Sequence, residues 1–252
     1  MLLAIDVGNT NTVLGLFDGE ELIRSYRIKT DARSTADEFR LTFGGLLRED
    51  PEVTGVALCS TVPAVLREMR DMLERYYDKV PHVIIEPGAK TGVPVLTDNP
   101  KEVGADRIAN SLAAFTLYGG PCIVVDFGTS TNFDVVSAKG EFLGGALAPG
   151  VEISLDALAQ RAAQLRKVEF VAPRSVIGKN TVESLQSGSL YGFAGQIDGI
   201  VTRMIAVLGG KVAAVIATGG LAPFVIPESS TVTDHRPDLT LQGLRMVYDK
   251  NI

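Results

Sequence analysis

The sequence has no tryptophan, only two cysteines and only two histidines among its 252 residues. Cys59 and Cys122 each lie in an apolar run, which predicts two buried free thiols in a reducing compartment rather than a disulfide framework. His82 and His235 lack the spacing of metal ligands, so a zinc site is not expected. The N-terminus shows no signal peptide, and no apolar run approaches the roughly 18 residues of a membrane helix. We therefore expect a soluble cytoplasmic protein that does not enter a membrane.

Basic residues are outnumbered, with 24 Lys and Arg against 30 Asp and Glu, so the formal net charge is −6. This argues against the broad basic surface that nucleic-acid binding requires. It leaves room for a local anion site, because backbone N–H groups can bind an anion without Lys or Arg. Hydrophobic residues make up 46% of the chain, which is ample for a packed core. The length allows one large domain or two of ordinary size.

One short signature occurs twice, 120 positions apart. The first copy is Ile5-Asp6-Val7-Gly8-Asn9-Thr10 and the second is Val125-Asp126-Phe127-Gly128-Thr129-Ser130. Each copy is followed by a second β-like run, at 13–17 and at 133–136. Twin strand–turn–strand loops indicate two related halves that face each other across a cleft. A polyphosphate held by both loops is the expected occupant, which favours a nucleotide-dependent phosphoryl-transfer enzyme.

Hydrophobic periodicity and turn residues predict an alternation of strands and helices. Thr35 and Glu38 form a capping-box pattern at one predicted helix start. In the first half we expect strands at 2–7, 13–17, 22–28, 55–60 and 82–85, and helices at 35–47, 63–76 and 103–118. In the second half we expect strands at 122–126, 132–137, 141–147 and 212–217, helices at 151–165, 181–208 and 239–249, and a polar segment at 167–180.

This order predicts an α/β protein with two βββαβαβ halves, residues 1–118 and 119–252, whose last helix packs back on the first half. The pattern is similar to the ribonuclease-H-like halves of the actin, hexokinase and sugar-kinase superfamily, which implies an interdomain nucleotide cleft. Architecture alone does not give a substrate.

The two loops carry the predicted phosphate chemistry. In the first, Gly8 allows a tight turn, and Asn9, Thr10, Asn11 and Thr12 offer donors to phosphate oxygens. Asp6 cannot bind phosphate directly and is expected to hold Mg²⁺. In the second loop, Asp126 suits a cation, and the hydroxyls of Thr129, Ser130 and Thr131 suit the terminal phosphates. A plain hairpin turn is the alternative for either copy alone, and the repetition favours phosphate binding.

Three other segments have a functional and a structural interpretation. Gly144–Gly150 precedes a helix, where it would bind an anion, pack closely or simply connect strand to helix. Ala217-Thr218-Gly219-Gly220 follows a buried strand, where the glycines would let adenine and ribose lie against the backbone or end the strand in a turn. Gly178-Lys179-Asn180-Thr181 is not a Walker loop, because Pro173 stands where a glycine is required.

Gly104-Ala105-Asp106-Arg107 places opposite charges at the start of a predicted helix. Arg107 suits a substrate carboxylate, and Asp106 suits the proton of an attacking hydroxyl. An exposed helix-start ion pair is slightly favoured by sequence order alone.

Taken together and in this order, the two Asp-x-Gly loops, Gly104–Arg107, Gly144–Gly150 and Ala217–Gly220 resemble type III pantothenate kinases from end to end. The resemblance implies phosphorylation of pantothenate by ATP, the first step of coenzyme A synthesis, with Mg²⁺ and a monovalent cation, K⁺ or NH₄⁺. It also implies a homodimer, to which the long helix after Thr181 would contribute.

The resemblance further implies site roles, residue by residue. Asp106 is the general base on the pantothenate hydroxyl, Asp6 lies near Mg²⁺, and Asp126 binds the monovalent cation. The implied substrate contacts are Thr97, Gly104, Ala105, Asp106, Arg107 and Thr181. The implied ATP contacts are Asp6, Val7, Gly8, Asn9, Thr10, Asn11, Thr12, Val13, Thr129, Gly219 and Gly220.

The sequence departs from the family at Thr97, which precedes Asp98-Asn99-Pro100 where the family often has Tyr. A hydroxyl remains, but the aromatic face is lost. Two alternatives stay open: a kinase for another small hydroxylated acid, and a regulatory paralogue that keeps the fold without turnover. Retention of Asp6, Asp106, Arg107 and Asp126 together speaks against the paralogue.

Overall fold

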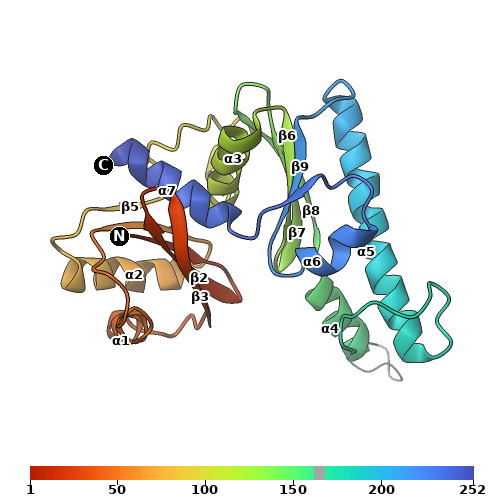
Figure 1. Cartoon of the computed structure of the whole chain (residues 1–252), viewed down its shortest axis with the longest axis horizontal. Coiled ribbons are helices and arrows are strands. Elements are labelled where there is room, and N and C mark those ends of the chain that lie inside the picture. Colours follow the sequence, from red (N-terminus) through yellow and green to blue (C-terminus); the bar gives the residue numbers. More distant parts are fainter. Residues whose placement is uncertain (162–167) are drawn as a thin grey trace. The chain divides into compact units, whose positions relative to one another are not determined.

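The computed structural model describes residues 1–161 and 168–252 (Figure 1). The chain forms two compact units and passes from one to the other several times. Each unit contains one five-stranded sheet. The first unit comprises residues 1–93, 98–113 and 239–252, and the second comprises 94–97 and 114–238.

The sheet of the first unit has the strand order β3-β2-β1-β4-β5. The central strand, β1, is antiparallel to β2 and parallel to β4. Its residues from Leu3 to Ile5 are fully buried, as expected of a strand covered on both faces. The strand bounds are Leu2–Val7 for β1, Asn11–Asp18 for β2, Glu21–Lys29 for β3, Gly55–Ser60 for β4 and His82–Ile84 for β5.

Helices α1 (Ala36–Leu46) and α2 (Pro63–Tyr76) pack on each other, and α7 (Leu239–Asn251) packs on β1, β4 and β5. The predicted capping box is confirmed at the start of α1, where the Thr35 hydroxyl accepts the Glu38 N–H and the Glu38 carboxylate accepts the Thr35 N–H. Phe39 and Phe43 of α1 are buried against β1 and β4 in one continuous core. This core holds the carboxyl end of β1 in place.

The second unit repeats the arrangement with the strand order β10-β9-β6-β7-β8. Its central strand, β6, is antiparallel to β7 and parallel to β9, as β1 is to β2 and β4. The predicted duplication therefore extends from the signature to the sheet topology. The strand bounds are Cys122–Phe127 for β6, Ser130–Val136 for β7, Phe142–Pro149 for β8, Ala214–Thr218 for β9 and Asp234–His235 for β10.

The long helix α5 (Thr181–Val207) lies along the second sheet, and its residues Ala194, Ile197 and Val201 are buried in that unit's core (Figure 1). Among the described residues, none of the helices combines the length and apolar character needed to cross a membrane. The remaining helices are α3 (Ala105–Tyr118), α4 (Val151–Arg161), the one-turn α6 (Ala222–Val225) and the 3₁₀ turns η1 (Pro100–Glu102) and η2 (Ile226–Glu228).

The predicted α/β fold is confirmed, with differences at element ends. Strand β2 begins at Asn11 rather than residue 13, because Asn11 and Thr12 already pair with β3. Helix α3 begins at Ala105 rather than residue 103. The helix predicted at 151–165 is observed to Arg161, and residues 162–165 lie outside the described part. The predicted boundary after residue 118 stays a prediction about the extent of the two repeated halves.

Asp198, in the C-terminal half of α5, binds the turn at residues 229–231, which leads into β10. Its carboxylate accepts hydrogen bonds from the hydroxyls of Ser229, Ser230 and Thr231 and from the backbone N–H groups of Ser230 and Thr231. Partial burial alone would raise the pKa of Asp198, but these donors favour the ionised form and lower it well below its usual range. The ionised carboxylate therefore stabilises the second unit.

We expect Asp198→Ala to lower the free energy of unfolding by about 1–2 kcal/mol at pH 7, because it removes the acceptor shared by Ser229, Ser230 and Thr231, which are only partly shielded from water. The stabilisation is present above the unfolded pKa of 3.8 and is lost as the pH falls through the lower folded value. Urea unfolding at pH 7 and pH 3 should therefore show a difference from wild type that shrinks in acid. Glu228→Ala, which removes an exposed charge beside the same turn, is the control. Equal losses in the two variants would contradict the role of Asp198.

Candidate functional site

The carboxyl ends of β1 and β4 meet the start of α3 in the first unit. Asp6 on β1 lies beside Cys59 on β4 in the parallel register. The Thr61 N–H and hydroxyl both donate to the Val7 carbonyl, at 3.0 and 3.3 Å, and tie the two strand ends together. Gly104 lies against them, because a methyl group on it would be 3.8 Å from the Thr61 side chain. Ligand sites in open α/β sheets form at such strand ends.

Asp6 is the most perturbed carboxyl group at this place. Burial, and then the negative charge of Asp106, raise the pKa of Asp6 from 3.8 to about 7, while the hydrogen bond from Cys59 acts in the opposite direction. The Cys59 thiol donates to Asp6 Oδ1 at 3.2 Å. Burial, and then the charge of Asp6, raise the pKa of Cys59, so the thiol keeps its proton. Asp6 and Asp106, 100 positions apart in the chain, therefore form one electrostatic site.

Asp106 lies in the first turn of α3 and is partly buried. Its carboxylate accepts the backbone N–H of Arg107 at 2.9 Å. Burial raises the pKa of Asp106, and the Arg107 N–H and guanidinium act against that rise. A methyl group on Gly104 would lie 2.5 Å from Asp106 Oδ1, so only glycine leaves room for this carboxylate. Sequence order alone favoured an exposed ion pair of Asp106 and Arg107. The structure shows both residues partly buried, so that prediction of exposure is wrong.

Helix α7 fixes the position of α3. Gly243 of α7 touches the backbone of Ala109, so closely that any side chain at 243 would overlap it. About one turn earlier in α7, the Thr240 hydroxyl donates to Asn110 Oδ1 at 2.8 Å. This close crossing holds the Asp106 end of α3 toward the ends of β1 and β4.

The first predicted phosphate loop is a tight turn between β1 and β2. The Gly8 N–H donates to the Asn11 carbonyl at 3.0 Å, and Asn9 and Thr10 are exposed. Thr12 is fully buried, and its hydroxyl lies 2.9 Å from that of Thr30. We therefore assign the Thr12 side chain to the packing of the loop. Val7 is buried, and Asn11 and Val13 are partly buried.

The second loop has the same frame around Asp126. Asp126 pairs with Asn132 on β7 and with Thr218 on β9, as Asp6 pairs with Val13 and Cys59. The second turn is one residue shorter, so the Gly128 N–H donates to the Ser130 carbonyl at 3.0 Å. The Ser130 hydroxyl donates to Asn132 Oδ1, and Thr131 is fully buried. Thr129 is left as the exposed hydroxyl of the predicted cluster.

Two glycines of other segments pack on this loop. Gly219 has a φ of +91°, and a methyl group there would lie 2.7 Å from Asp126 Oδ1. A methyl group on Gly150 would lie 2.5 Å from the Gly128 carbonyl oxygen. The structure thus brings Asp126, Thr129 and Gly219 together, with Gly220 exposed just beyond. In the run 144–150, Gly145 packs against the backbone of Phe133 on β7, so close packing explains that glycine.

Two predicted substrate residues lie elsewhere in the second unit. Thr97 follows a backbone pairing with β8, in which the Leu96 N–H donates to the Phe142 carbonyl at 2.9 Å. The Thr97 hydroxyl oxygen is buried and makes no hydrogen bond with the described residues, so a donor or acceptor is missing there. Thr181 is exposed at the first residue of α5, behind its N-cap Asn180.

The sequence patterns did not predict that Cys59 and Thr61 belong to the site. Both follow an apolar run that predicts only a buried strand and its end. The parallel register that places Cys59 beside Asp6 is a long-range pairing that no local pattern indicates.

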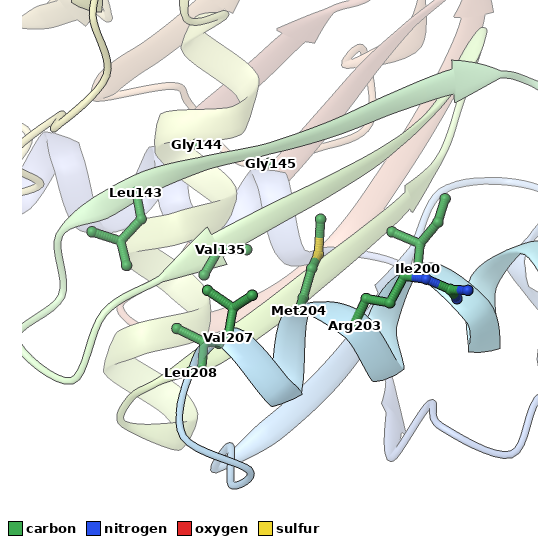
Figure 2. A pocket seen from close by; sticks show the side chains of 9 residues that line it. All are labelled: Val135, Leu143, Gly144, Gly145, Ile200, Arg203, Met204, Val207 and Leu208. Carbon is green, nitrogen blue, oxygen red and sulfur yellow. The ribbon is translucent and has the colours of Figure 1, made fainter.

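An apolar pocket of about 380 Å³ lies between α5 and the strands β7 and β8 (Figure 2). The side chains of Ile200, Met204 and Val207 form one wall and those of Val135 and Leu143 the other. Arg203 lies at its edge and donates to the Gly199 carbonyl of its own helix. Such a lining does not suit a phosphate, and apart from the glycine run at Gly144 and Gly145 it contains none of the residues predicted to bind.

The carboxylates at the two loops are the candidate ligands for a metal ion. Among the described residues, no group of three or more His, Cys, Asp or Glu could hold a metal ion. Asp6 with its neighbour Asp106 does fit Mg²⁺ in one respect, because Mg²⁺ in phosphoryl-transfer sites uses one or two carboxylates and takes its other ligands from phosphate and water. A cation would also relieve the repulsion that raises the pKa of Asp6.

We expect Asp6→Asn to stabilise the ligand-free protein at pH 8 by about 3 kcal/mol. The folded pKa of about 7 exceeds the unfolded value of 3.8, so the ionisation penalty is absent below pH 3.8, grows between the two values and is complete above pH 7. Urea unfolding should show the gain at pH 8 and none at pH 3. Asp18→Asn, at the exposed far end of the β2 strand, is the control. A destabilised Asp6→Asn variant at pH 8 would contradict the raised pKa assigned to burial and to the charge of Asp106.

Solved structures of low sequence identity share the fold. The ROK hexokinase of Thermus thermophilus aligns with a TM-score of 0.56 at 14% identity, over 99% of this chain and 98% of that one. The activator of the 2-hydroxyisocaproyl-CoA dehydratase of Clostridium difficile, solved with bound ADPNP, also gives 0.56 at 14% identity, over 99% of this chain and 93% of that one. Both comparisons support the two-unit architecture.

Sequence relatives define the family. The family model described as type III pantothenate kinase matches residues 2–203. Proteins named type III pantothenate kinase are 69% identical in Salinispora arenicola and 66% identical in Frankia alni, each over the whole of both chains. With these full-length matches and the paired Asp loops in hand, we conclude that the chain belongs to the type III pantothenate kinase family.

Proposed function

We propose that this protein transfers the γ-phosphoryl group of ATP to the primary hydroxyl of pantothenate. The product is 4'-phosphopantothenate, and the reaction is the first step of coenzyme A synthesis. Membership of the family supports the activity. The observation that carries the mechanism is the packing of the start of α3, which bears Asp106, against the ends of β1 and β4, where Asp6 lies. Burial there, and then the charge of Asp106, raise the pKa of Asp6.

Asp106 is the proposed general base. A base that accepts a proton from a hydroxyl works best when its pKa is raised toward the working pH, and burial raises that of Asp106. Its hydrogen bond from the Arg107 N–H fixes the carboxylate in the space that Gly104 leaves open. Positioning of this kind and electrostatic stabilisation supply most of the rate enhancement in phosphoryl transfer.

Asp6 is the proposed residue for Mg²⁺. When bound, the metal would neutralise charge on the phosphates of ATP. The protein supplies the Asp6 carboxylate, which accepts a hydrogen bond from the Cys59 thiol and lies within the electrostatic influence of Asp106. The exposed turn at Asn9 and Thr10 offers donors to the same phosphates.

The other substrate contacts are proposals that rest on the family motif. Gly104, Ala105 and Arg107 would contact pantothenate beside Asp106, with Arg107 facing its carboxylate. The buried, unpaired hydroxyl oxygen of Thr97 supports a polar contact there, in place of the aromatic residue usual in the family. Thr181, exposed at the start of α5, is proposed as a further contact.

On the second unit, Thr129, Gly219 and Gly220 are proposed to contact the nucleotide. The positive φ of Gly219 and its packing on Asp126 support a turn whose backbone approaches a ligand closely. Asp126 is the proposed ligand of K⁺ or NH₄⁺. A homodimer and a cytoplasmic location also belong to the proposal. A kinase for another hydroxylated acid is tested by comparing such acids with pantothenate in an ADP-release assay, and a regulatory paralogue would bind ATP without releasing ADP.

Replacing the base tests the mechanism directly. We expect Asp106→Asn to lower the turnover number by about 10²–10⁴-fold, because the hydroxyl loses its proton acceptor. The assay is ADP release with pantothenate and ATP. Asp98→Asn, an exposed change just upstream in the chain, should keep normal turnover. Near-normal turnover of Asp106→Asn would remove Asp106 from its role.

Replacing the second aspartate tests the monovalent cation. Wild-type activity should rise at least about fivefold when choline is exchanged for K⁺ at constant ionic strength, because a site carboxylate binds the smaller hard cation. Asp126→Asn should lose this stimulation while it still folds, as judged by its thermal unfolding. Undiminished K⁺ stimulation in Asp126→Asn would place the monovalent cation elsewhere.

A further inference from the structure

A buried thiol touches the carboxylate that the mechanism assigns to Mg²⁺. Cys59 has no solvent-exposed surface, and its Sγ lies 3.2 Å from Asp6 Oδ1. The contact follows from the sheet itself, since Asp6 and Cys59 are paired in the parallel register of β1 and β4. The strand pairing therefore keeps the two residues side by side.

The chemistry of this contact suits the control of a carboxylate. A thiol is a weak neutral donor that fits within an apolar strand, where a charged donor would require a partner of its own. The thiol donates to one carboxylate oxygen, Oδ1, and so restrains the orientation of the group. Groups behind a metal ligand commonly set its orientation in this way.

The second unit offers a comparison at the corresponding position. Asp126 is paired in the parallel register with Thr218, so each aspartate has a short side chain with an O–H or S–H group as its neighbour. Cys122, the other buried cysteine, is paired with Ala214 instead. Burial is the cause of the raised pKa of Cys122, whereas the charges of Asp6 and Asp106 also act on Cys59.

We propose that Cys59 is a positioning residue for phosphoryl transfer, whose thiol orients the Asp6 carboxylate toward the cation that accompanies the nucleotide. The inference rests on the proposed function of Asp6. It assigns to Cys59 neither nucleophilic nor redox chemistry.

The first test separates cation use from general damage. Cys59→Ala should raise the Mg²⁺ concentration for half-maximal activity about tenfold, as other changes behind metal ligands do, and leave the KM for pantothenate unchanged. Cys59→Ser, which restores a donor, should recover most of the loss. Cys122→Ala is the matched control, because it removes an equally buried thiol that has no carboxylate beside it. A Cys59→Ala enzyme with the Mg²⁺ dependence of Cys122→Ala would overturn the proposal.

A second readout needs no turnover. The rise in melting temperature produced by Mn²⁺ in the presence of ADP should require about tenfold more Mn²⁺ in Cys59→Ala than in wild type and in Cys122→Ala. In the ligand-free protein, Cys59→Ala should increase the unfolding equilibrium constant about threefold to tenfold more when Asp6 is present than in the Asp6→Ala background, because only the former loses the hydrogen bond. Additive effects in this cycle would overturn the contact.

The Asp6→Ala enzyme distinguishes the two ways of failing. If Asp6→Ala transfers phosphate normally, the proposed role of Asp6 fails, and the role of Cys59 fails with it. If Asp6→Ala is inactive while Cys59→Ala matches Cys122→Ala in every readout, the inference about Cys59 alone is overturned.

Discussion

The burial of Asp6 beside a second carboxylate is the constraint on which the candidate site of the first unit depends. Asp6 at the end of β1 and Asp106 at the start of α3 are close enough for the charge of Asp106 to raise the pKa of Asp6. Such a pair disfavours folding, so other contacts in the folded protein must offset its cost. The same pair favours the binding of a cation. The surrounding structure imposes the pair. Thr61 ties the two strand ends together, Gly104 leaves room for Asp106, and Gly243 holds α3 in place. The chain thus holds the two carboxylates close to each other at the expense of its own stability.

The second unit uses the same sheet for a different purpose. Asp126 has the position of Asp6 in the topology, with Thr218 in the place of Cys59. Its turn is one residue shorter, and Gly150 and Gly219 pack directly on it. A duplicated strand–turn–strand frame has therefore acquired two environments. One holds a carboxylate against a like charge, and the other holds a carboxylate against the backbone of neighbouring segments.

Local sequence patterns predicted most of the fold, because each of the apolar strands, the Thr35 capping box and the repeated loop depends on residues close together in the sequence. The motifs at Asp6, Asp106 and Asp126 were also found this way, by their repetition and by family resemblance. The predictions that failed concern burial and contacts that depend on residues far away in the sequence. The burial of the Asp106 turn results from its packing near Thr61, and the burial of Thr12 results from Thr30 on the neighbouring strand. Cys59 gained its role only through a register between strands some fifty residues apart, which no periodicity encodes.

The return of the chain through α7 has a consequence for biosynthesis. Leu239, Leu241, Leu244 and Val247 are buried in the first unit, although they are translated only after the second unit. Domains generally fold from the N-terminus onward as the ribosome releases them, but here the second unit has all its residues once Asp238 has emerged, whereas the first lacks one wall of its core until α7 follows. The α7-facing side of the nascent first sheet therefore stays uncovered while the second unit is translated. A premature stop just before α7 would remove Thr240 and Gly243, and with them the support of α3, and leave the second unit intact.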